Sequence, residues 1–379
     1  MRVLIVTGIW PPDVGGPASH APEVAAFLQG RGHRVEVLTT ADRPPAPAPH
    51  PVRWVSRAIP IGLRHVAGTF QIARHARAAN VVYSTGMFGR SAIGAALARR
   101  PLVVKLTGDP AFERARNRRL HRGSLEEFQR APRGRRVGLL LGFRNWSLRR
   151  ARHIFCPSAY LREVALGWGI EPARVSVLPN PAPSVDSLAQ EGVLRDRLGV
   201  EGGMLVFAGR LTAQKALPLA LEAVARAGDV SLVLAGDGPD RAALERRADE
   251  LGLGARARFL GPHTRAQVLE LFRAGDAALL SSSWENFPHT VVEALAAGTP
   301  VIATDTGGVG EVVRHEGNGL LVAPGDVDAL AGAIRRFFDD DALRARLRAA
   351  AAPSVADYAP ERVYARLDEV LREVAGRTA

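Results

Sequence analysis

Two glutamates, Glu285 and Glu293, have seven residues between them and could bind one ligand from two sides. A short apolar run ends at residue 281 and is typical of a buried parallel strand. Glu285 then falls in the loop at the end of that strand, and Glu293 falls one to two turns into the following helix. Ligands of open α/β sheets usually bind at such loops. The free backbone N–H groups at the start of the helix suit a phosphate, and they belong to Phe287, His289 and Thr290. The alternative is that Glu285 is an ordinary loop charge and Glu293 a solvated helix residue.

Two cations follow another predicted strand, at residues 204–208. The strand ends in Gly209-Arg210, and Lys215 comes five residues later, on or just before a helix. An arginine binds a phosphate in a bidentate manner, and a lysine adds a point charge. The pair therefore predicts a diphosphate site, the alternative being two solvated surface charges.

A glycine pair, Gly15-Gly16, follows the first predicted strand, residues 2–7. Paired glycines let the backbone approach a ligand closely, although they also occur in ordinary tight turns. The loop does not match the G-x-G-x-x-G fingerprint, which argues against a nicotinamide dehydrogenase.

Asp109 lies just after the strand at residues 102–106, where a loop carboxylate could line a site. A strongly basic segment follows. Residues 113–152 contain 13 arginines and three glutamates, which gives most of the chain's net charge of +12.

Within this basic segment, residues 137–150 combine apolar residues, a tryptophan and arginines. That composition suits an amphipathic helix on an anionic membrane or near a lipid-linked acceptor. It suits a core helix with a solvated arginine edge equally well. Nucleic acid is a third interpretation, but no recognition motif accompanies the charge.

The elements that must position these residues alternate between strand and helix in both halves of the 379-residue chain. We expect a proline-rich loop at 43–51, then helices at about 67–79 and 90–99. Such alternation predicts α/β architecture with two doubly wound parallel sheets. A single cysteine, Cys156, leaves no internal disulfide and favours a reducing compartment. No apolar run approaches the roughly 20 residues of a membrane span.

Taken together, these segments resemble the retaining GT-B glycosyltransferases, the large group 1 (GT4-like) family. The resemblance is carried by E-x7-E inside SxxxENFPxTxVEAxAxGTPVIAT, by GRLxxxK at residues 209–215, and by PPxxGGP before a helix. It implies a GT-B fold whose two Rossmann-like domains face each other across a cleft. The implied divisions are an acceptor-side domain at 1–181, a nucleotide-sugar domain at 182–356 and a returning helix at 357–379.

The resemblance also implies roles for individual residues. Glu285 would contact the donor sugar's hydroxyls, Glu293 the ribose, and Gly209, Arg210 and Lys215 the diphosphate. Further donor-binding residues would be Gly15, Gly16, Pro262, Asn286, Phe287, Pro288, His289 and Thr290. In many relatives a histidine at this strand end touches the reacting sugar. Here Asp109 stands near that position, which implies a place in the reaction, and the GDxAxE pattern matches a bacterial cell-surface-glycan subgroup.

These observations predict a retaining hexosyltransferase that uses a UDP- or GDP-linked sugar and needs neither a metal nor another cofactor. Its expected partners are the nucleotide sugar, a glycan or lipid-linked acceptor, and an anionic membrane surface met by residues 113–152, but not nucleic acid. Its expected location is the cytoplasm, peripherally on the inner face of the membrane. The alternatives are an inactive nucleotide-sugar-binding or scaffold protein and a GT-B-fold epimerase.

Overall fold

The computed structural model describes residues 1–13, 16–121, 123–130, 134–185 and 191–377. The chain divides into two compact units. The N-terminal unit comprises Met1–Pro179 together with Glu361–Ala379, and the C-terminal unit comprises Asn180–Pro360. The sequence-based division sets its boundaries at residues 181 and 356.

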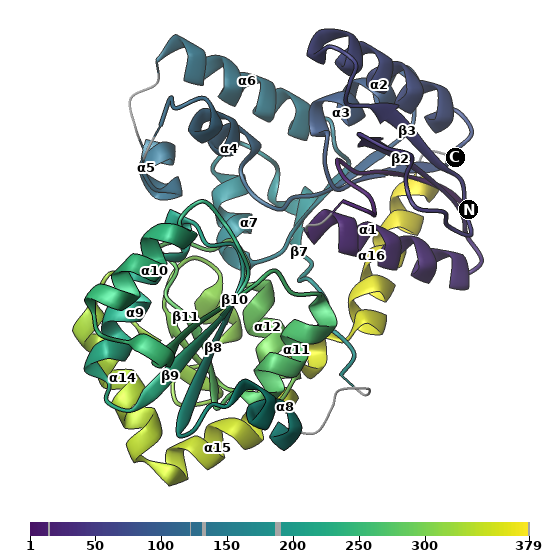
Figure 1. Cartoon of the computed structure of the whole chain (residues 1–379). Coiled ribbons are helices and arrows are strands. Elements are labelled where there is room, and N and C mark those ends of the chain that lie inside the picture. Colours follow the sequence, from purple (N-terminus) through teal and green to yellow (C-terminus); the bar gives the residue numbers. More distant parts are fainter. Residues whose placement is uncertain (14–15, 122, 131–133, 186–190, 378–379) are drawn as a thin grey trace. The chain divides into compact units, whose positions relative to one another are not determined.

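A seven-stranded parallel sheet forms the centre of the N-terminal unit (Figure 1). Its spatial order is β3-β2-β1-β4-β5-β6-β7. The strands are β1 (Arg2–Val6), β2 (Arg34–Ala41), β3 (Val52–Ser56), β4 (Val81–Ser84), β5 (Leu102–Lys105), β6 (His153–Cys156) and β7 (Val175–Val177).

The strands of this sheet are apolar on both faces. In β1, Leu4 and Val6 join one hydrophobic cluster, while Val3 and Ile5 join the cluster on the opposite face. Burial on both faces is typical of parallel sheets covered by crossover helices. The strand order reverses between β1 and β4, which are direct neighbours.

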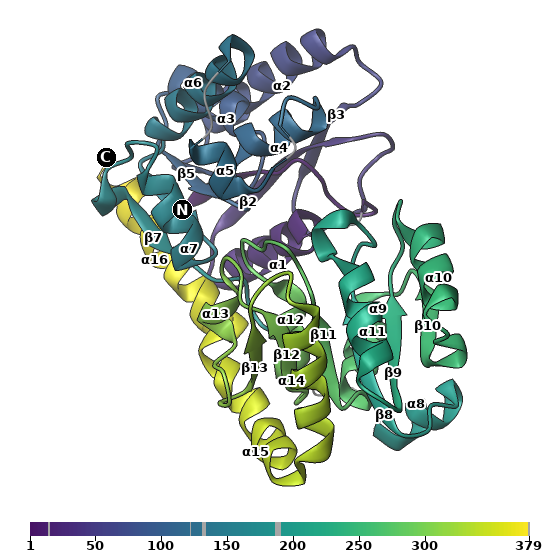
Figure 2. The same ribbon diagram turned by 90° about the vertical axis from the view of Figure 1, so that its left-hand side faces the viewer.

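Helices cover both faces of this sheet, as Figure 2 shows from a second direction. They are α1 (Gly16–Gly30), α2 (Ile61–Ala76), α3 (Phe88–Leu97), α4 (Pro110–Asn117), α5 (Leu125–Arg130), α6 (Arg135–Arg149), α7 (Ala159–Leu166) and α16 (Pro360–Gly376). A short 3-10 turn, η1 (Pro172–Arg174), precedes β7.

Helix α16 returns from the end of the chain to the N-terminal unit. Leu367 and Leu371 are fully buried in the same cluster as β1. Nε2 of His33 lies 2.7 Å from the Asp368 carboxylate, which joins the helix to the segment before β2. The last segment is therefore part of the first unit's core.

A six-stranded parallel sheet with the order β10-β9-β8-β11-β12-β13 forms the centre of the C-terminal unit. The strands are β8 (Gly203–Ala208), β9 (Val230–Ala235), β10 (Ala257–Gly261), β11 (Ala277–Leu280), β12 (Val301–Thr304) and β13 (Gly319–Val322). In β8, Val206 and Phe207 pack into clusters on opposite faces. The strand order reverses between β8 and β11, which pair directly.

The helices of this unit complete both layers. They are α8 (Glu191–Leu198), α9 (Leu217–Arg226), α10 (Arg241–Glu250), α11 (Arg265–Ala274), α12 (His289–Ala296), α13 (Val309–Val312), α14 (Val327–Asp339) and α15 (Asp341–Ala351). The 3-10 turns are η2 (Ala213–Lys215), η3 (Gly254–Arg256) and η4 (Ala352–Tyr358).

The predicted fold class is confirmed: both units are α/β with doubly wound parallel sheets. The prediction was wrong between residues 52 and 66. Strand β3 was not predicted, because it is an edge strand in which only Val55 is buried. Helix α2 begins at Ile61 rather than near residue 67. Within the described residues, no helix is both long and apolar enough to cross a membrane.

Candidate functional site

The reversal of strand order in the C-terminal unit brings two predicted loops together. The turn η2 follows β8, the loop 281–288 follows β11, and these two strands are neighbours. Open α/β sheets bind ligands at such a switch point, beyond the carboxyl ends of the strands. Several hydrogen bonds tie the two loops together, among them Ser283 N–H to Gln214 O (2.9 Å), Gln214 Nε2 to Trp284 O (3.0 Å) and Ser281 Oγ to Lys215 O (2.8 Å).

Lys215 and Glu285 meet at this switch point. Nζ of Lys215 donates to Oε1 of Glu285 at 2.5 Å, and Ser282 Oγ donates to the same oxygen at 2.8 Å. Glu285 is buried, whereas the Lys215 side chain is 17% exposed. The carboxylate is therefore fixed in direction, while the lysine side chain stays partly accessible.

The backbone of Glu285 is held by a glycine turn. Gly308 N–H donates to the Glu285 carbonyl at 3.1 Å. Gly307 has φ +55°, and a Cβ on it would lie 1.7 Å from the same carbonyl oxygen. Only glycine permits this approach, so the loop position depends on Gly307.

Arg210 differs from Lys215 in having no partner. It is exposed, and it makes no hydrogen bond or ion pair with any part of the chain that the structure describes. The preceding Gly209 is anchored by its N–H, which donates to Ala235 O at 3.0 Å. The structure therefore fixes the base of this turn and leaves the guanidinium available for an anion.

The start of α12 supplies backbone donors beside these cations. The helix has Pro288 as its N-cap residue and no side-chain cap. His289 N–H donates to Phe287 O at 3.1 Å. The N–H groups of Phe287 and Thr290 have no acceptor among the described residues, and such groups at a helix start attract anions. The His289 ring is oriented by Asn180, whose Nδ2 lies 2.9 Å from its Nε2.

Glu293 is placed one turn further along α12, as predicted, and it is not solvated. Arg265, the first residue of α11, donates from Nε to Oε1 of Glu293 at 2.9 Å. The Glu293 side chain is only 14% exposed. Pro262 is exposed directly after β10. The sequence did not reveal the Arg265 contact, because the two residues come from separate helices.

Asp109 belongs to the N-terminal unit and is completely buried. It is the N-cap of α4 and accepts from the N–H groups of Ala111 (2.8 Å) and Phe112 (3.3 Å). Its other oxygen accepts from Gln129 Nε2 (3.0 Å) and Arg144 Nη1 (2.5 Å). Four donors thus occupy this carboxylate, and its predicted place in the reaction stays a prediction.

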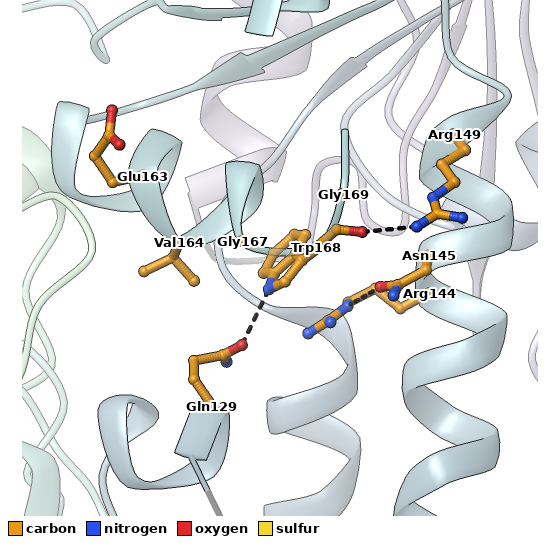
Figure 3. A pocket seen from close by; sticks show the side chains of 9 residues that line it. All are labelled: Gln129, Arg144, Asn145, Arg149, Glu163, Val164, Gly167, Trp168 and Gly169. Carbon is orange, nitrogen blue, oxygen red and sulfur yellow. Dashed lines mark hydrogen bonds between the residues drawn. The ribbon is translucent and has the colours of Figure 1, made fainter. Parts of the chain in front are cut away.

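Arg144 and its neighbours line a pocket of about 560 Å³ in the same unit (Figure 3). The guanidinium of Arg144 lies 4.0 Å from the ring centre of Trp168, which in turn donates to Gln129 at 3.1 Å. Sequence reasoning treated Arg144 as one of many membrane-facing or solvated arginines. That interpretation is wrong for this residue, because its side chain is buried in an ion pair.

The glycine pair after β1 is only half described. Gly16 is the first residue of α1, and Gly15 lies outside the described residues. The loop starts at the N-terminal unit's own switch point, between β1 and β4. Its predicted contact with donor phosphates stays a prediction.

Comparison with known families accounts for both units. A model described as "Glycosyltransferase Family 4" matches residues 14–183, and "Glycosyl transferases group 1" matches residues 197–353. The chain belongs to the glycosyl transferases group 1 family. These enzymes are glycosyltransferases, and the matched regions contain every candidate residue named above.

Two curated relatives align with different shares of this chain. The lipopolysaccharide core biosynthesis glycosyltransferase LpsD of Rhizobium meliloti is 42% identical over 38% of this chain and 42% of its own length. The glycogen synthase of Mycobacterium tuberculosis is 28% identical over 93% of this chain and 89% of its own length. The chain thus aligns with less than half of LpsD and with most of the glycogen synthase.

Among solved structures, Anabaena Alr3699/HepE in complex with UDP resembles the chain with a TM-score of 0.80. The alignment covers 98% of this chain and all of that one, at 22% identity. Similarity at this level of identity establishes the fold.

Proposed function

We propose that this family member is a retaining glycosyltransferase that moves a hexosyl unit from a UDP- or GDP-linked sugar to an acceptor hydroxyl. The observation that carries the proposal is the switch point of the C-terminal unit. There the Lys215–Glu285 pair, the partner-free Arg210 and the start of α12 meet on loops tied to each other. This combination suits a ligand that has both a diphosphate and a sugar.

The diphosphate is the leaving group, so negative charge grows on it as the bond to the anomeric carbon breaks. Arg210 and Lys215 would stabilise that charge, together with the N–H groups of Phe287 and Thr290. Because these groups already supply positive charge and N–H donors, the proposal needs neither a divalent metal nor another cofactor.

Glu285 would orient the donor sugar through its hydroxyl groups. Its Oε1 is occupied by Lys215 and Ser282, which aim the carboxylate and leave Oε2 for a sugar hydroxyl. The bond from the anomeric carbon to the phosphate oxygen breaks while the acceptor oxygen bonds to the same face of that carbon. The departing phosphate oxygen takes the acceptor's proton, and the anomeric configuration is retained.

The nucleoside would lie toward α11 and β10. Glu293 would accept from the ribose hydroxyls, and the backbone near Pro262 would contact the base. The structure of Anabaena Alr3699/HepE holds UDP, which supports a uridine nucleotide as the first donor to test.

The proposed acceptor is a lipid-linked glycan or another cell-envelope precursor, met from the cytoplasmic side of the membrane. The similarity to LpsD, named for lipopolysaccharide core biosynthesis, supports a cell-surface acceptor. The basic segment 113–152 supports a membrane-proximal location.

Thermal shift against a panel of UDP- and GDP-sugars tests donor binding, since a ligand at 100 times its Kd stabilises by about 2.7 kcal/mol. The best donor is then incubated with the protein alone, and NMR follows the products. Slow release of free sugar with the donor's anomeric configuration is the expected result. Conversion of the donor to another nucleotide sugar would indicate an epimerase, and binding without turnover an inactive protein.

A further inference from the structure

Three helices of the N-terminal unit carry large apolar side chains on their outer faces. Helix α3 packs between α2 and α6, which the two views of the fold agree on (Figures 1 and 2). The side chains that are more than one third exposed on these helices are Ile61, Leu63, Val66, Phe70, Leu97, Leu139, Phe143 and Trp146. In α6 the exposed residues 139, 143 and 146 follow helical spacing, so they form a single stripe.

A cavity of about 870 Å³ opens between these helices, and we call it the α2–α6 groove. Its volume is within the roughly 300–1,000 Å³ of small-molecule sites. Most of its lining is apolar, including Val66, Phe70, Met87, Ile93 and Phe143. Grouped apolar surface of this kind, rimmed by polar residues, marks an interaction site rather than scattered exposure.

The polar part of the groove carries one sign of charge. Its described lining contains five arginines and no carboxylate. These are Arg74, Arg77, Arg90, Arg114 and Arg118.

Arg90 is less exposed than the other four arginines of the lining. Its Nη1 is buried and has no hydrogen-bond acceptor among the described residues. Burial, and then the like charges of Arg64 and Arg114, lower the pKa of Arg90 to about 10. Arg90 is partly buried, and charges removed from water are normally paired, so a negative group bound beside Nη1 would be stabilised.

The packing of the helices holds Arg90 in this place. A Cβ on Gly68 of α2 would lie 3.2 Å from its Nη1, and a Cβ on Gly89 would lie 2.3 Å from the Phe143 ring. Both glycines therefore let a large side chain pack against a neighbouring helix. The Arg90 guanidinium and the Phe143 ring are thereby presented to the same groove.

We propose that the α2–α6 groove binds one anionic lipid of a bilayer, its hydrocarbon chain along Val66, Phe70 and Phe143 and its phosphate on Arg90 and Arg114. A groove whose lining combines apolar side chains with arginines matches a molecule that has a hydrocarbon chain and an anionic head. This inference rests on the proposed function, because it states how a membrane-borne acceptor would be reached. It places the lipid contact on α2 and α3 as well as on the basic segment 113–152.

Vesicle flotation tests the proposal with the full chain and no sugar donor. The probes are vesicles of phosphatidylcholine alone and of phosphatidylcholine mixed with phosphatidylglycerol, at low and at high salt. The chain should bind the mixed vesicles at low salt and the neutral ones at least tenfold more weakly.

Two variants distinguish the contribution of the lipid's hydrocarbon chain from that of its headgroup. Phe70→Ser removes an exposed aromatic ring and should weaken binding to mixed vesicles about tenfold. Arg90→Gln should weaken it about fivefold, and the matched control Arg346→Gln, an exposed arginine of the C-terminal unit, should leave it unchanged within twofold.

Several outcomes would overturn the inference. No binding to either vesicle would do so, as would wild-type binding by Phe70→Ser, since the attachment would then depend on charge alone. An equal loss in Arg346→Gln would assign the effect to net charge rather than to the groove. Thermal unfolding of each variant checks that it is folded.

Stabilisation by the nucleotide sugar should be the same in wild type and in both groove variants. If donor binding fails in all of them while lipid binding behaves as expected, the proposed function is wrong and the lipid site stands. If donor binding is normal and lipid binding fails, only the lipid site is wrong.

Discussion

Glu285 and Asp109 are both buried carboxylates just beyond the end of a parallel strand, each with a cation 2.5 Å away. They differ in what else they bind. Asp109 also caps a helix and accepts from a glutamine, and its partner Arg144 is itself 4% exposed. Glu285 caps no helix, and its partner Lys215 is partly exposed and follows the partner-free Arg210 by five residues.

The difference teaches how to separate a structural carboxylate from a functional one in the same fold. A carboxylate whose oxygens are all engaged by its own chain contributes to folding. A carboxylate held by one oxygen, on a loop near a cation that has no partner, is prepared for a ligand. Four experiments test this contrast, in order of decreasing effect.

Asp109→Ala should lower the free energy of unfolding by about 3–5 kcal/mol, because it leaves Arg144 buried without its partner. Urea unfolding measures the change. Asp326→Ala is the matched control, since Asp326 is an exposed N-cap, and it should cost only about 1 kcal/mol. Equal effects of the two substitutions would show that Asp109 acts as a cap and nothing more.

Arg210→Ala should lower kcat/KM about 10²- to 10³-fold, as removal of a donor to a developing anion does. Because Arg210 is exposed, its free energy of unfolding should change by no more than about 0.5 kcal/mol. Arg246→Ala, at an exposed position of α10, is the control and should leave turnover unchanged. Unchanged kcat/KM in both Arg210→Ala and Lys215→Ala would reject the diphosphate assignment.

Glu285→Gln should mainly lower kcat, and Glu293→Gln should mainly weaken nucleotide binding. A contact to the sugar as its bond breaks affects kcat, whereas a ribose contact present throughout affects binding. Glu285→Gln should slow turnover and leave UDP or GDP affinity nearly intact. Glu293→Gln should weaken that affinity about tenfold, since a hydrogen bond to a charged group contributes about 1.5–3 kcal/mol.

Isothermal titration and steady-state kinetics measure the two quantities. Arg265→Gln is the control for Glu293, because it removes the arginine and keeps the carboxylate. If Glu285→Gln abolished nucleotide binding and Glu293→Gln did not, the two roles would be exchanged.

Ser282→Ala should have the smallest effect, a reduction in kcat of about fivefold, which corresponds to one hydrogen bond of about 1 kcal/mol. Its hydroxyl only orients Oε1 of Glu285. A loss as large as that of Glu285→Gln would mean that Ser282 itself contacts the substrate.

The sequence was informative for functional residues that lie just after the ends of strands. Buried parallel strands are continuous apolar runs, so their ends, and with them Arg210, Lys215 and Glu285, could be placed in advance. The 2.5 Å contact between Lys215 and Glu285 depends on β8 and β11 being neighbours, which the predicted architecture only implies.

The remaining features depend on contacts between distant segments. Asp109 and Arg144 are 35 positions apart, and nothing local in the basic segment distinguishes Arg144 from the arginines around it. The groove on α2 was missed for a related reason. The apolar residues Ile61 and Val66 are exposed, so the start of α2 lacks the pattern of buried apolar and exposed polar residues that identifies a helix. The helix was therefore predicted to begin later.

The return of α16 has a consequence for synthesis on the ribosome. The C-terminal unit is one continuous stretch, Asn180–Pro360, and can fold as soon as it has emerged. The N-terminal unit needs Leu367 and Leu371 to fill its core and Asp368 to meet His33. Although domains generally complete their folding in the order in which they are made, here the segment made first is completed last. Until α16 has been made, the apolar face of the first sheet that this helix covers stays uncovered.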